Sequence, residues 1–235
     1  MLDVFFPRDC LQCGEPVEAE SPLKAVCAAC VRRIHEVGSL ACETCGYPIY
    51  GKVEVSRECP HCQYLRPFFQ KGLTTVVLRG APRKLVHELK YHDNFLALSD
   101  MKALFRRSEP LREFLAGGGI LVPVPLHPRR ERERGFNQSH ELAKVLAGLA
   151  PEVLRVEQVL KRVRDTETQT QFTRQQREKN LKNAFAIHQP FLFDRKLRFI
   201  LVDDVFTTGS TLNACASILS RAGCKNLAVV TFGHG

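Results

Sequence analysis

"RFILVDDVFTTGSTLNACASIL", residues 198–219, joins an apolar run, two aspartates, a short polar loop and a helical pattern. The run at 199–202 is continuous and apolar, which is typical of a strand buried on both faces of a parallel sheet. From Leu212 onward the apolar residues recur at helical spacing, and Ser210 or Thr211 is a plausible N-cap. The stretch therefore predicts a strand, a tight loop and a helix. In such units, ligands bind beyond the carboxyl ends of the strands.

The loop between strand and helix has the composition of a phosphate site. Its five residues are Thr207, Thr208, Gly209, Ser210 and Thr211. They offer free backbone N–H groups, hydroxyl donors and the positive end of a helix dipole. Asp203 and Asp204 would repel a phosphate, but carboxylates suit ribose hydroxyls, or a magnesium ion that shares those hydroxyls. We therefore expect this segment to bind a ribose 5′-phosphate.

Other interpretations of the same stretch fit less well. The two aspartates could merely solvate a surface loop, but the ordered combination of strand, carboxylates, hydroxyl loop and helix is more specific than that. The chain contains neither the G-x-x-x-x-G-K-[ST] loop of Walker A nucleotide sites nor a G-x-G-x-x-G dinucleotide fingerprint.

The N-terminal part of the chain contains an internal duplication. Eight of the ten cysteines form four C-x-x-C pairs: Cys10/Cys13, Cys27/Cys30, Cys42/Cys45 and Cys59/Cys62. A shift of 32 residues superimposes the first two pairs on the last two, and it maps Gly14 and Pro16 onto Gly46 and Pro48. The duplicated unit therefore carries four thiols.

A C-x-x-C pair followed by glycine is typical of a zinc knuckle, and two knuckles supply the four sulfurs of a structural zinc site. We expect two closed structural Zn²⁺ sites, paired along the sequence. Interleaved pairing, and replacement of one sulfur by His61, stay open. A disulfide framework is the alternative, but "MLDVFFPRDC" lacks the features of a signal peptide, so we expect a cytoplasmic protein with reduced thiols.

The middle of the chain predicts a strand in "LTTVVLRG", helices over 82–91 and 95–105, and a turn at "LKYHDN", residues 89–94. This basic turn either borders a site or is a solvated loop. No apolar run approaches the length of a membrane span.

A second polar loop follows the apolar strand at 120–122. It contains Arg129, Arg130, Arg132 and Arg134 and leads through Gly135 to a helix capped near Asn137 or Ser139. Alternating arginine and glutamate is usually a solvated face. This run, however, follows the end of a strand, and its planar donors suit a pyrophosphate. His127 and His140 are candidates for a general base by position only.

A third loop, "RDTETQTQFTRQQREKN" at 164–180, has almost no large apolar residue and is expected to be a functional lid. Residues 161–198 hold ten Lys and Arg against four Asp and Glu, and 129–134 hold four against two. These two stretches carry most of the net charge of +9, so the excess fits an anionic ligand and leaves nucleic acid open.

These motifs resemble a known family. "VDDVFTTGST" is similar to the motif by which type I phosphoribosyltransferases bind phosphoribosyl pyrophosphate. Together with the tandem C-x-x-C pairs, "LKYH", "VPVPLHPRR" and "RGFNQS", it resembles the ComF family, including the GntX-like proteins associated with natural competence and DNA utilisation. The resemblance covers nearly the whole chain.

The resemblance implies a type I phosphoribosyltransferase fold, an α/β fold with a mainly parallel, doubly wound sheet. We expect it at 67–235, with a double zinc-ribbon module at 1–66. The phosphate loop would hold the 5′-phosphate, and Asp203 and Asp204 the ribose. Arg129, Arg130 and Arg134, with Mg²⁺, would neutralise the departing diphosphate. The resemblance to purine-type enzymes implies a catalytic lid with Arg164, Gln169 and Arg177.

A second class of function stays open. The chain could sense phosphoribosyl pyrophosphate or a nucleotide without turnover, while its ribbons bind single-stranded DNA or a DNA-processing protein. Tyr47, Tyr50, Arg32 and Arg33 are the ribbon residues available for such contacts.

Overall fold

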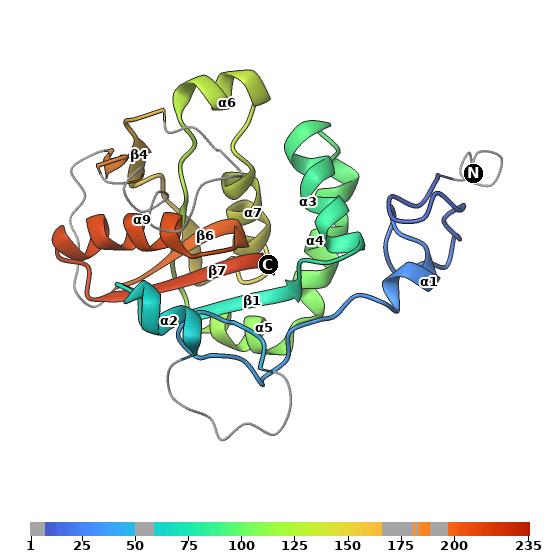
Figure 1. The fold of residues 1–235 in the computed structure, drawn as a ribbon, viewed down its shortest axis with the longest axis horizontal. Coiled ribbons are helices and arrows are strands. Elements are labelled where there is room, and N and C mark those ends of the chain that lie inside the picture. The colour runs from blue at the N-terminus through green and yellow to red at the C-terminus, as the bar shows by residue number, and fades with distance from the viewer. Residues whose placement is uncertain (1–7, 50–58, 166–180, 182, 189–196) are drawn as a thin grey trace.

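The computed structural model describes residues 8–49, 59–165, 181, 183–188 and 197–235. Its centre is a five-stranded sheet in the order β1-β7-β6-β2-β3, and every neighbouring pair in it is parallel (Figure 1). A separate antiparallel pair joins β4 and β5. The predicted fold class is therefore confirmed: a doubly wound, mainly parallel sheet follows the N-terminal zinc-ribbon segment.

The strands are β1 (Lys71–Val77), β2 (Gly119–Pro123), β3 (Leu154–Val156), β4 (Leu160–Arg162), β5 (Phe185–Ile187), β6 (Arg198–Phe206) and β7 (Asn226–His234). The helices are α1 (Ala28–Val31), α2 (Pro60–Leu65), α3 (Ala81–Tyr91), α4 (Phe95–Arg107), α5 (Glu109–Ala116), α6 (Pro128–Arg134), α7 (Gln138–Ala147) and α9 (Ser210–Arg221).

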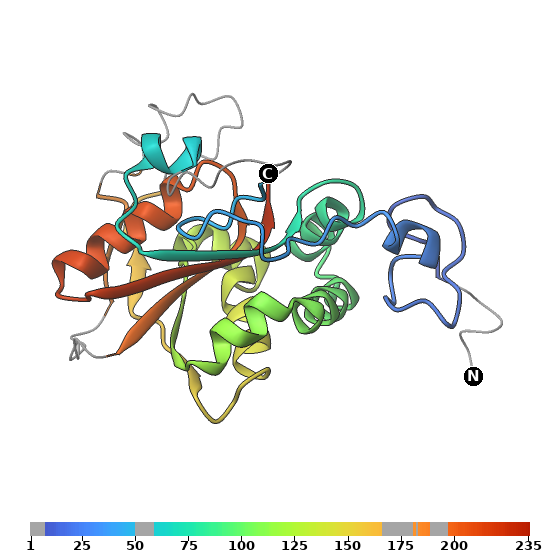
Figure 2. The same cartoon turned by 90° about the horizontal axis from the view of Figure 1, so that it is seen from below.

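The sheet is buried on both faces, and alternate residues of the central strands β2, β6 and β7 enter different cores. In β6, Ile200 and Val202 pack into a core with α3, α4, α5 and α7, whereas Phe199 and Leu201 pack into a core with α9. Figure 2 shows the red helix α9 on one side of the strands and the bright green helix α5 on the other. This explains why the strand sequence is continuously apolar rather than alternating.

The two four-cysteine clusters dock on different parts of the fold. The first packs against α4, where the backbone N–H groups of Lys24 and Ala25 donate to the buried Asp100 carboxylate at 2.6 and 2.8 Å. The second lies against the edge strand β1. There Gly46 and Gly72 let the two backbones approach so closely that a Cβ at Gly72 would lie 2.7 Å from the Thr44 carbonyl oxygen.

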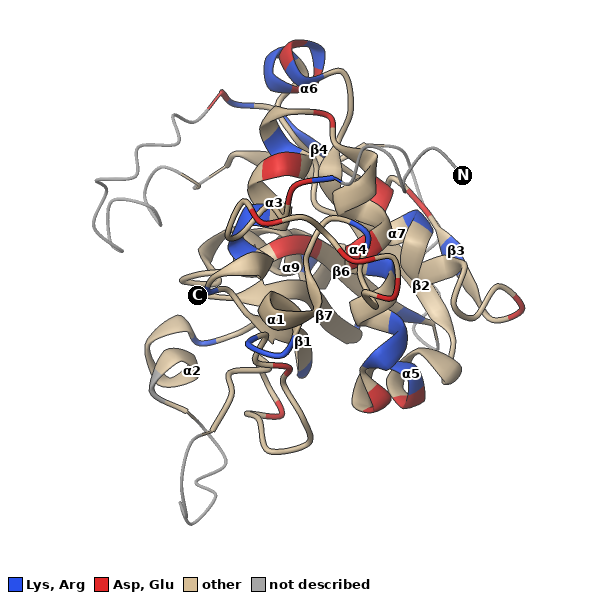
Figure 3. Cartoon of the chain, turned by 90° about the vertical axis from the view of Figure 1, so that its right-hand side faces the viewer, with Lys and Arg blue, Asp and Glu red and all other residues tan. Residues whose placement is uncertain are grey.

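Three local predictions are wrong. Residues 128–134 form helix α6, not a loop: Pro128 occupies its first turn, the His127 ring accepts from Arg129 N–H, and Gly135 ends it with φ of 81°. The capping residues thus stabilise a helix at both ends, although its alternating charges are those expected of a solvated loop. Figure 3 shows these alternating charges on α6. The first half of "LKYHDN" belongs to α3 rather than to a turn. The N-cap of α9 is Gly209.

Candidate functional site

The acidic pair, Asp203 and Asp204, lies where the connections that follow neighbouring strands pass to opposite faces of the sheet. Strand β6 continues past Asp203 and Asp204 to Phe206 because β7 pairs with it to the end, whereas its pairing with β2 stops at Val202. After β2 and the short exposed helix α6, the chain continues into α7, which packs in one core, whereas α9, which follows β6, packs in the other. The aspartates therefore lie at the carboxyl edge of a topological switch point, the usual ligand position of open α/β sheets.

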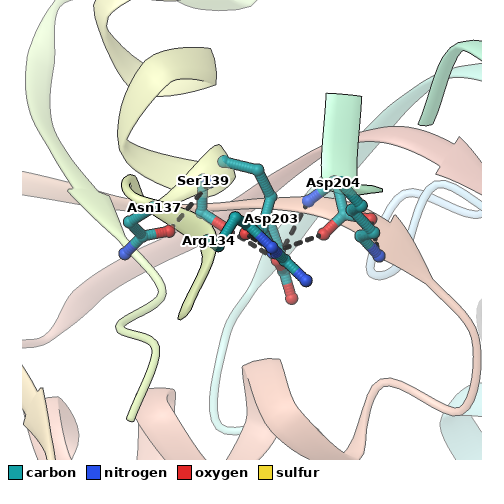
Figure 4. Close-up of polar contacts among 7 residues, drawn as sticks. Arg134, Asn137, Ser139, Asp203 and Asp204 are labelled. Carbon is teal, nitrogen blue, oxygen red and sulfur yellow. Dashed lines mark hydrogen bonds and ion pairs between the residues drawn. The ribbon is translucent and has the colours of Figure 1, made fainter. Parts of the chain in front are cut away.

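Residues from two helices, α3 and α7, hold the two carboxylates. The Ser139 hydroxyl donates to Asp203 Oδ1 at 2.8 Å, and the Gln138 side chain donates to Asp204 Oδ1 at 3.1 Å. Lys90, from the last turn of α3, forms an ion pair with Asp204 Oδ2. Figure 4 shows Ser139 and the two aspartates pointing toward one another from α7 and β6. Asn137 fixes the start of α7 by accepting from Ser139 N–H at 3.0 Å.

Burial and the nearby charges shift the pKa values of the two carboxyl groups in opposite directions. Burial and the negative charge of Asp204 raise the pKa of Asp203 to about 7. Burial acts on Asp204 in the same direction, but the Lys90 ammonium and the Gln138 hydrogen bond lower its pKa below the usual value. Burial lowers the pKa of Lys90, but the Asp204 charge outweighs it and raises this pKa overall. At neutral pH the pair therefore holds one firmly ionised carboxylate and one that readily exchanges a proton.

A cavity of about 610 Å³ opens above the pair. It is lined by Lys90, Tyr91, Asp93, Val124, Pro125, Leu126, Arg130, Glu133, Arg134, Gln138, Ser139, Arg162, Asp203, Asp204 and Thr211. Four cationic side chains thus line a space that four acidic residues, Asp93, Glu133, Asp203 and Asp204, also line. Such a lining suits a ligand with both anionic groups and hydroxyls.

The predicted phosphate loop forms a smaller hollow beside this cavity. Residues 207–212 line it together with Asp203 and Val205, and Thr211 lines both spaces. Gly209 has φ of 72°, and a Cβ there would lie 2.4 Å from Phe206 Cζ. Within the loop, the Thr208 and Ser210 hydroxyls are hydrogen-bonded at 2.9 Å. The glycine is therefore required both by its backbone conformation and by the space around it.

The predicted arginines are divided between the cavity and the surface. Arg130 and Arg134 line the cavity, and the Arg134 guanidinium lies 5.7 Å from the centre of the Tyr91 ring. Arg129 is exposed and pairs with Glu133 at 2.9 Å and with Asp165 at 3.7 Å. Arg164 is exposed, and Gln169 and Arg177 lie outside the described residues.

Neither histidine suggested as a base lines the cavity. His127 caps α6 and lies 3.8 Å from Asp165. His140 is half-buried on α7, where burial lowers its pKa.

The sequence interpretation missed four cavity residues as site residues. Lys90, Gln138, Ser139 and Arg162 come from α3, α7 and β4. Of these, Lys90 has a signal in the sequence, because it belongs to the basic segment "LKYHDN", for which a place at the border of a site is one of two readings. Gln138 and Ser139 follow the predicted cap at Asn137, and Arg162 follows Lys161 in a strand of three residues. Only the fold brings these positions together.

The eight thiols form two clusters, paired along the sequence as predicted. The clusters are Cys10, Cys13, Cys27 and Cys30, and Cys42, Cys45, Cys59 and Cys62. Four sulfurs in a tetrahedron around zinc lie about 3.8 Å apart. The sulfurs are 3.7 Å apart in the pair Cys13–Cys27 and 3.8 Å apart in the pair Cys42–Cys62. Both clusters therefore fit a closed structural zinc site. His61 is outside the second cluster and packs on the Tyr47 ring at 4.4 Å.

Comparisons with known proteins agree with this architecture. A double zinc ribbon domain family matches residues 1–63. DNA utilization protein YhgH of Salmonella typhimurium strain LT2 is 32% identical over 210 residues, which cover 87% of this chain and 88% of the relative. Competence protein F of Haemophilus influenzae is 27% identical over 228 residues, 96% of each chain. Competence protein ComFC of Bacillus subtilis is 26% identical over 220 residues, 86% of this chain and 80% of the relative.

The fold and the cysteine clusters define a parallel α/β protein with two zinc-ribbon sites of four cysteines each. The chain belongs to the ComF family of competence and DNA-utilisation proteins. A solved purine phosphoribosyltransferase from Pyrococcus horikoshii Ot3 matches 54% of this chain and 79% of its own, with 16% identity and a TM-score of 0.31. Among the described helices, none has the length and apolar character of a membrane span.

Proposed function

We propose that the chain binds phosphoribosyl pyrophosphate with Mg²⁺ and transfers its phosphoribosyl group to an acceptor in DNA utilisation. The single observation that carries the proposal is the juxtaposition at the switch point. A hydroxyl- and glycine-rich loop at a helix start lies beside the half-buried Asp203, the buried Asp204 and a cavity with four cationic side chains. The proposed location is the cytoplasm, where thiols stay reduced and available to zinc.

Each part of the ligand has chemically matched residues. The loop at 207–211 would hold the 5′-phosphate through backbone N–H groups and hydroxyls. Asp203 and Asp204 would accept from the ribose hydroxyls, and their negative charge would stabilise the cationic sugar as its bond to pyrophosphate breaks. Arg130 and Arg134 would bind the diphosphate. Arg129 fits that role less well, because it is exposed, pairs with Glu133 and does not line the cavity.

The acidic pair also fits magnesium. Carboxylate oxygens are the ligands that Mg²⁺ prefers, and both carboxyls line the cavity. When bound there, the ion would neutralise charge on the diphosphate. Asp203 would need to release its proton to serve as a ligand, and its raised pKa makes this release sensitive to pH near neutrality.

A ligand sensor that acts on DNA without turnover is the second candidate. It is favoured by the names of the relatives, which refer to DNA utilisation and competence rather than to a transferase. On the ribbons, Arg32 and Arg33 are exposed, but Tyr47 packs between His61 and His234 and is not an exposed aromatic. Tyr50 lies outside the described residues.

The experiment that separates these candidates is a screen for pyrophosphate release. Purified protein with magnesium and phosphoribosyl pyrophosphate would be offered nucleobases, amines and single-stranded DNA as acceptors. A transferase releases pyrophosphate with at least one acceptor class. A sensor releases none, while its affinity for single-stranded DNA changes with the ligand. The Asp203→Asn/Asp204→Asn variant is the control for release catalysed by this site.

A further inference from the structure

Helix α2 connects the second zinc-ribbon site to the phosphate loop. Two of the four thiols of that site come from this helix: Cys59 is its N-cap, and Cys62 lies within it. The helix has six residues, too few for a stable helix by itself. Its geometry therefore depends on what holds its two ends, and at the N-terminal end that is the four-cysteine site.

The C-terminal end of α2 is held by Asn213, from the first turn of α9. Asn213 Nδ2 donates to the Leu65 carbonyl at 3.0 Å, and Asn213 Oδ1 accepts from Phe68 N–H at 2.8 Å. The backbone N–H of the same residue donates to the Gly209 carbonyl at 2.8 Å. One residue thus binds both the end of α2 and the glycine of the phosphate loop.

The Leu65 side chain adds direct packing against that glycine. A Cβ at Gly209 would lie 2.7 Å from Leu65 Cδ2. Leu65 is buried, and so is Phe206 on the other side of the glycine. The Phe206 ring stacks on His234 at 4.8 Å, and His234 contacts the Tyr47 ring of the second ribbon at 4.9 Å. The second ribbon therefore supports the phosphate loop in two ways: Leu65 packs against Gly209 directly, and Tyr47 contacts His234, which stacks on Phe206.

The first ribbon makes no corresponding contact among the described residues. It packs on α4 through Asp100, and Figure 1 shows α1 and α2 on opposite sides of the molecule. Under the 32-residue repeat, the position that corresponds to Leu65 is Arg33, which is exposed. The duplication thus supplies two chemically equivalent sites, one next to the phosphate loop and one remote from it.

We propose that the second four-cysteine site is the structural support of the phosphate loop, so that metal in this site and a phosphate monoester in the loop stabilise each other. Asn213 is the positioning residue that transmits the coupling. The inference rests on the proposed function, because it takes the loop at 207–211 as a phosphate site. Coupling between two ligands is reciprocal, so a phosphate monoester must protect the second metal site as much as the metal favours phosphate binding.

The test uses zinc-loaded, full-length protein and ribose 5-phosphate as the probe. A chelator is added with a thiol-labelling reagent, and the labelling rate of each cysteine peptide is followed by mass spectrometry. Ribose 5-phosphate at saturation should slow the labelling of Cys42, Cys45, Cys59 and Cys62 by at least about fivefold. Labelling of the four cysteines of the first cluster should not change. Equal protection of both clusters, or protection of neither, would overturn the proposal.

Asn213→Ala tests the positioning role. The variant should keep the zinc content of the wild type and bind ribose 5-phosphate about fivefold more weakly or worse. It should also lose the ligand-dependent protection of the second cluster. Leu65→Ala and Arg33→Ala form a matched pair across the repeat: the first should weaken ligand binding, and the second should not. Unchanged affinity and protection in Asn213→Ala would refute the coupling even if Leu65→Ala fails to fold.

Calorimetry distinguishes the two ways in which the inference can fail. If the wild type binds neither ribose 5-phosphate nor phosphoribosyl pyrophosphate, the proposed function fails and the coupling fails with it. If the wild type binds ribose 5-phosphate but the second cluster gains no protection, only the coupling is wrong.

Discussion

Lys90 and Asp204 form an ion pair that joins helix α3 to the carboxyl edge of the sheet. The two side chains are 24% and 4% exposed, so water screens this pair only weakly. Lys90 is also the only residue of α3 that contacts the acidic pair through an interaction identified within the described ranges. The pair therefore fixes both the charge of the site and the position of the helix that covers it.

Replacement of Lys90 by methionine should destabilise the protein and weaken ligand binding. The change leaves the Asp204 carboxylate buried without its cation, which typically costs about 3 kcal/mol or more. Urea unfolding should show this loss, and calorimetry should show weaker binding of phosphoribosyl pyrophosphate. Lys90→Arg is the control, since it keeps the charge. If Lys90→Met were as stable as the wild type, the ion pair would have no structural role.

The raised pKa of Asp203 predicts a specific dependence of stability on pH. Its folded pKa of about 7 exceeds the unfolded value, so the folded state binds this proton more tightly. The stabilisation of the folded state by this proton is complete below the pKa that Asp203 has in the unfolded chain, and it is lost as pH rises toward 7. Asp203→Asn removes this contribution. Without added magnesium, the free energy of unfolding of the wild type relative to Asp203→Asn should therefore decrease between about pH 4 and pH 7. A difference that is constant over this range would contradict the assigned pKa.

Gly209→Ala should abolish ligand binding at the loop. Alanine at φ of 72° is strained, and its Cβ would meet Phe206 and Leu65. We expect a loss of stability of about 1 to 3 kcal/mol and no measurable binding of ribose 5-phosphate. Gly135→Ala is the matched control: it shares the left-handed backbone, with φ of 81°, but its Cβ would meet no atom within 4 Å. If both variants bound ligand equally, the close packing at Gly209 would be irrelevant to the site.

The sequence predicted those parts of the site that are contiguous in the chain. Strand, carboxylates, hydroxyl loop and helix at 198–219 follow from local composition and period, and both four-cysteine clusters follow from spacing. Lys90, Gln138, Ser139 and Arg162 were missed because tertiary packing alone brings them to Asp203 and Asp204. Helix α6 was missed because its caps, rather than an apolar stripe, define it. The separate docking of the two ribbons depends on Asp100, Gly46 and Gly72. Asp100 and Gly72 have no sequence signature, and Gly46 is marked in the sequence only as a knuckle glycine, not as a contact with β1.

The predicted lid at 164–180 offers a test that distinguishes an enzyme from a sensor. Arg164 is exposed in this structure, and Arg177 lies outside the described residues. If both act on the transition state, Arg164→Ala/Arg177→Ala should lower turnover by orders of magnitude and change ground-state affinity for phosphoribosyl pyrophosphate much less. Pyrophosphate release and calorimetry measure the two effects. Equal losses in turnover and affinity would assign the arginines to ligand binding alone.

Calorimetric titration of phosphoribosyl pyrophosphate, with and without magnesium, tests the central claim most directly. Asp203→Asn/Asp204→Asn keeps the size of both side chains but removes their negative charge. We predict that the wild type binds the ligand with magnesium-dependent affinity and that the folded double variant binds it much more weakly and without that dependence. Equal affinity of the two proteins, or no binding by the wild type, would contradict the assignment of the acidic pair and its cavity to this ligand.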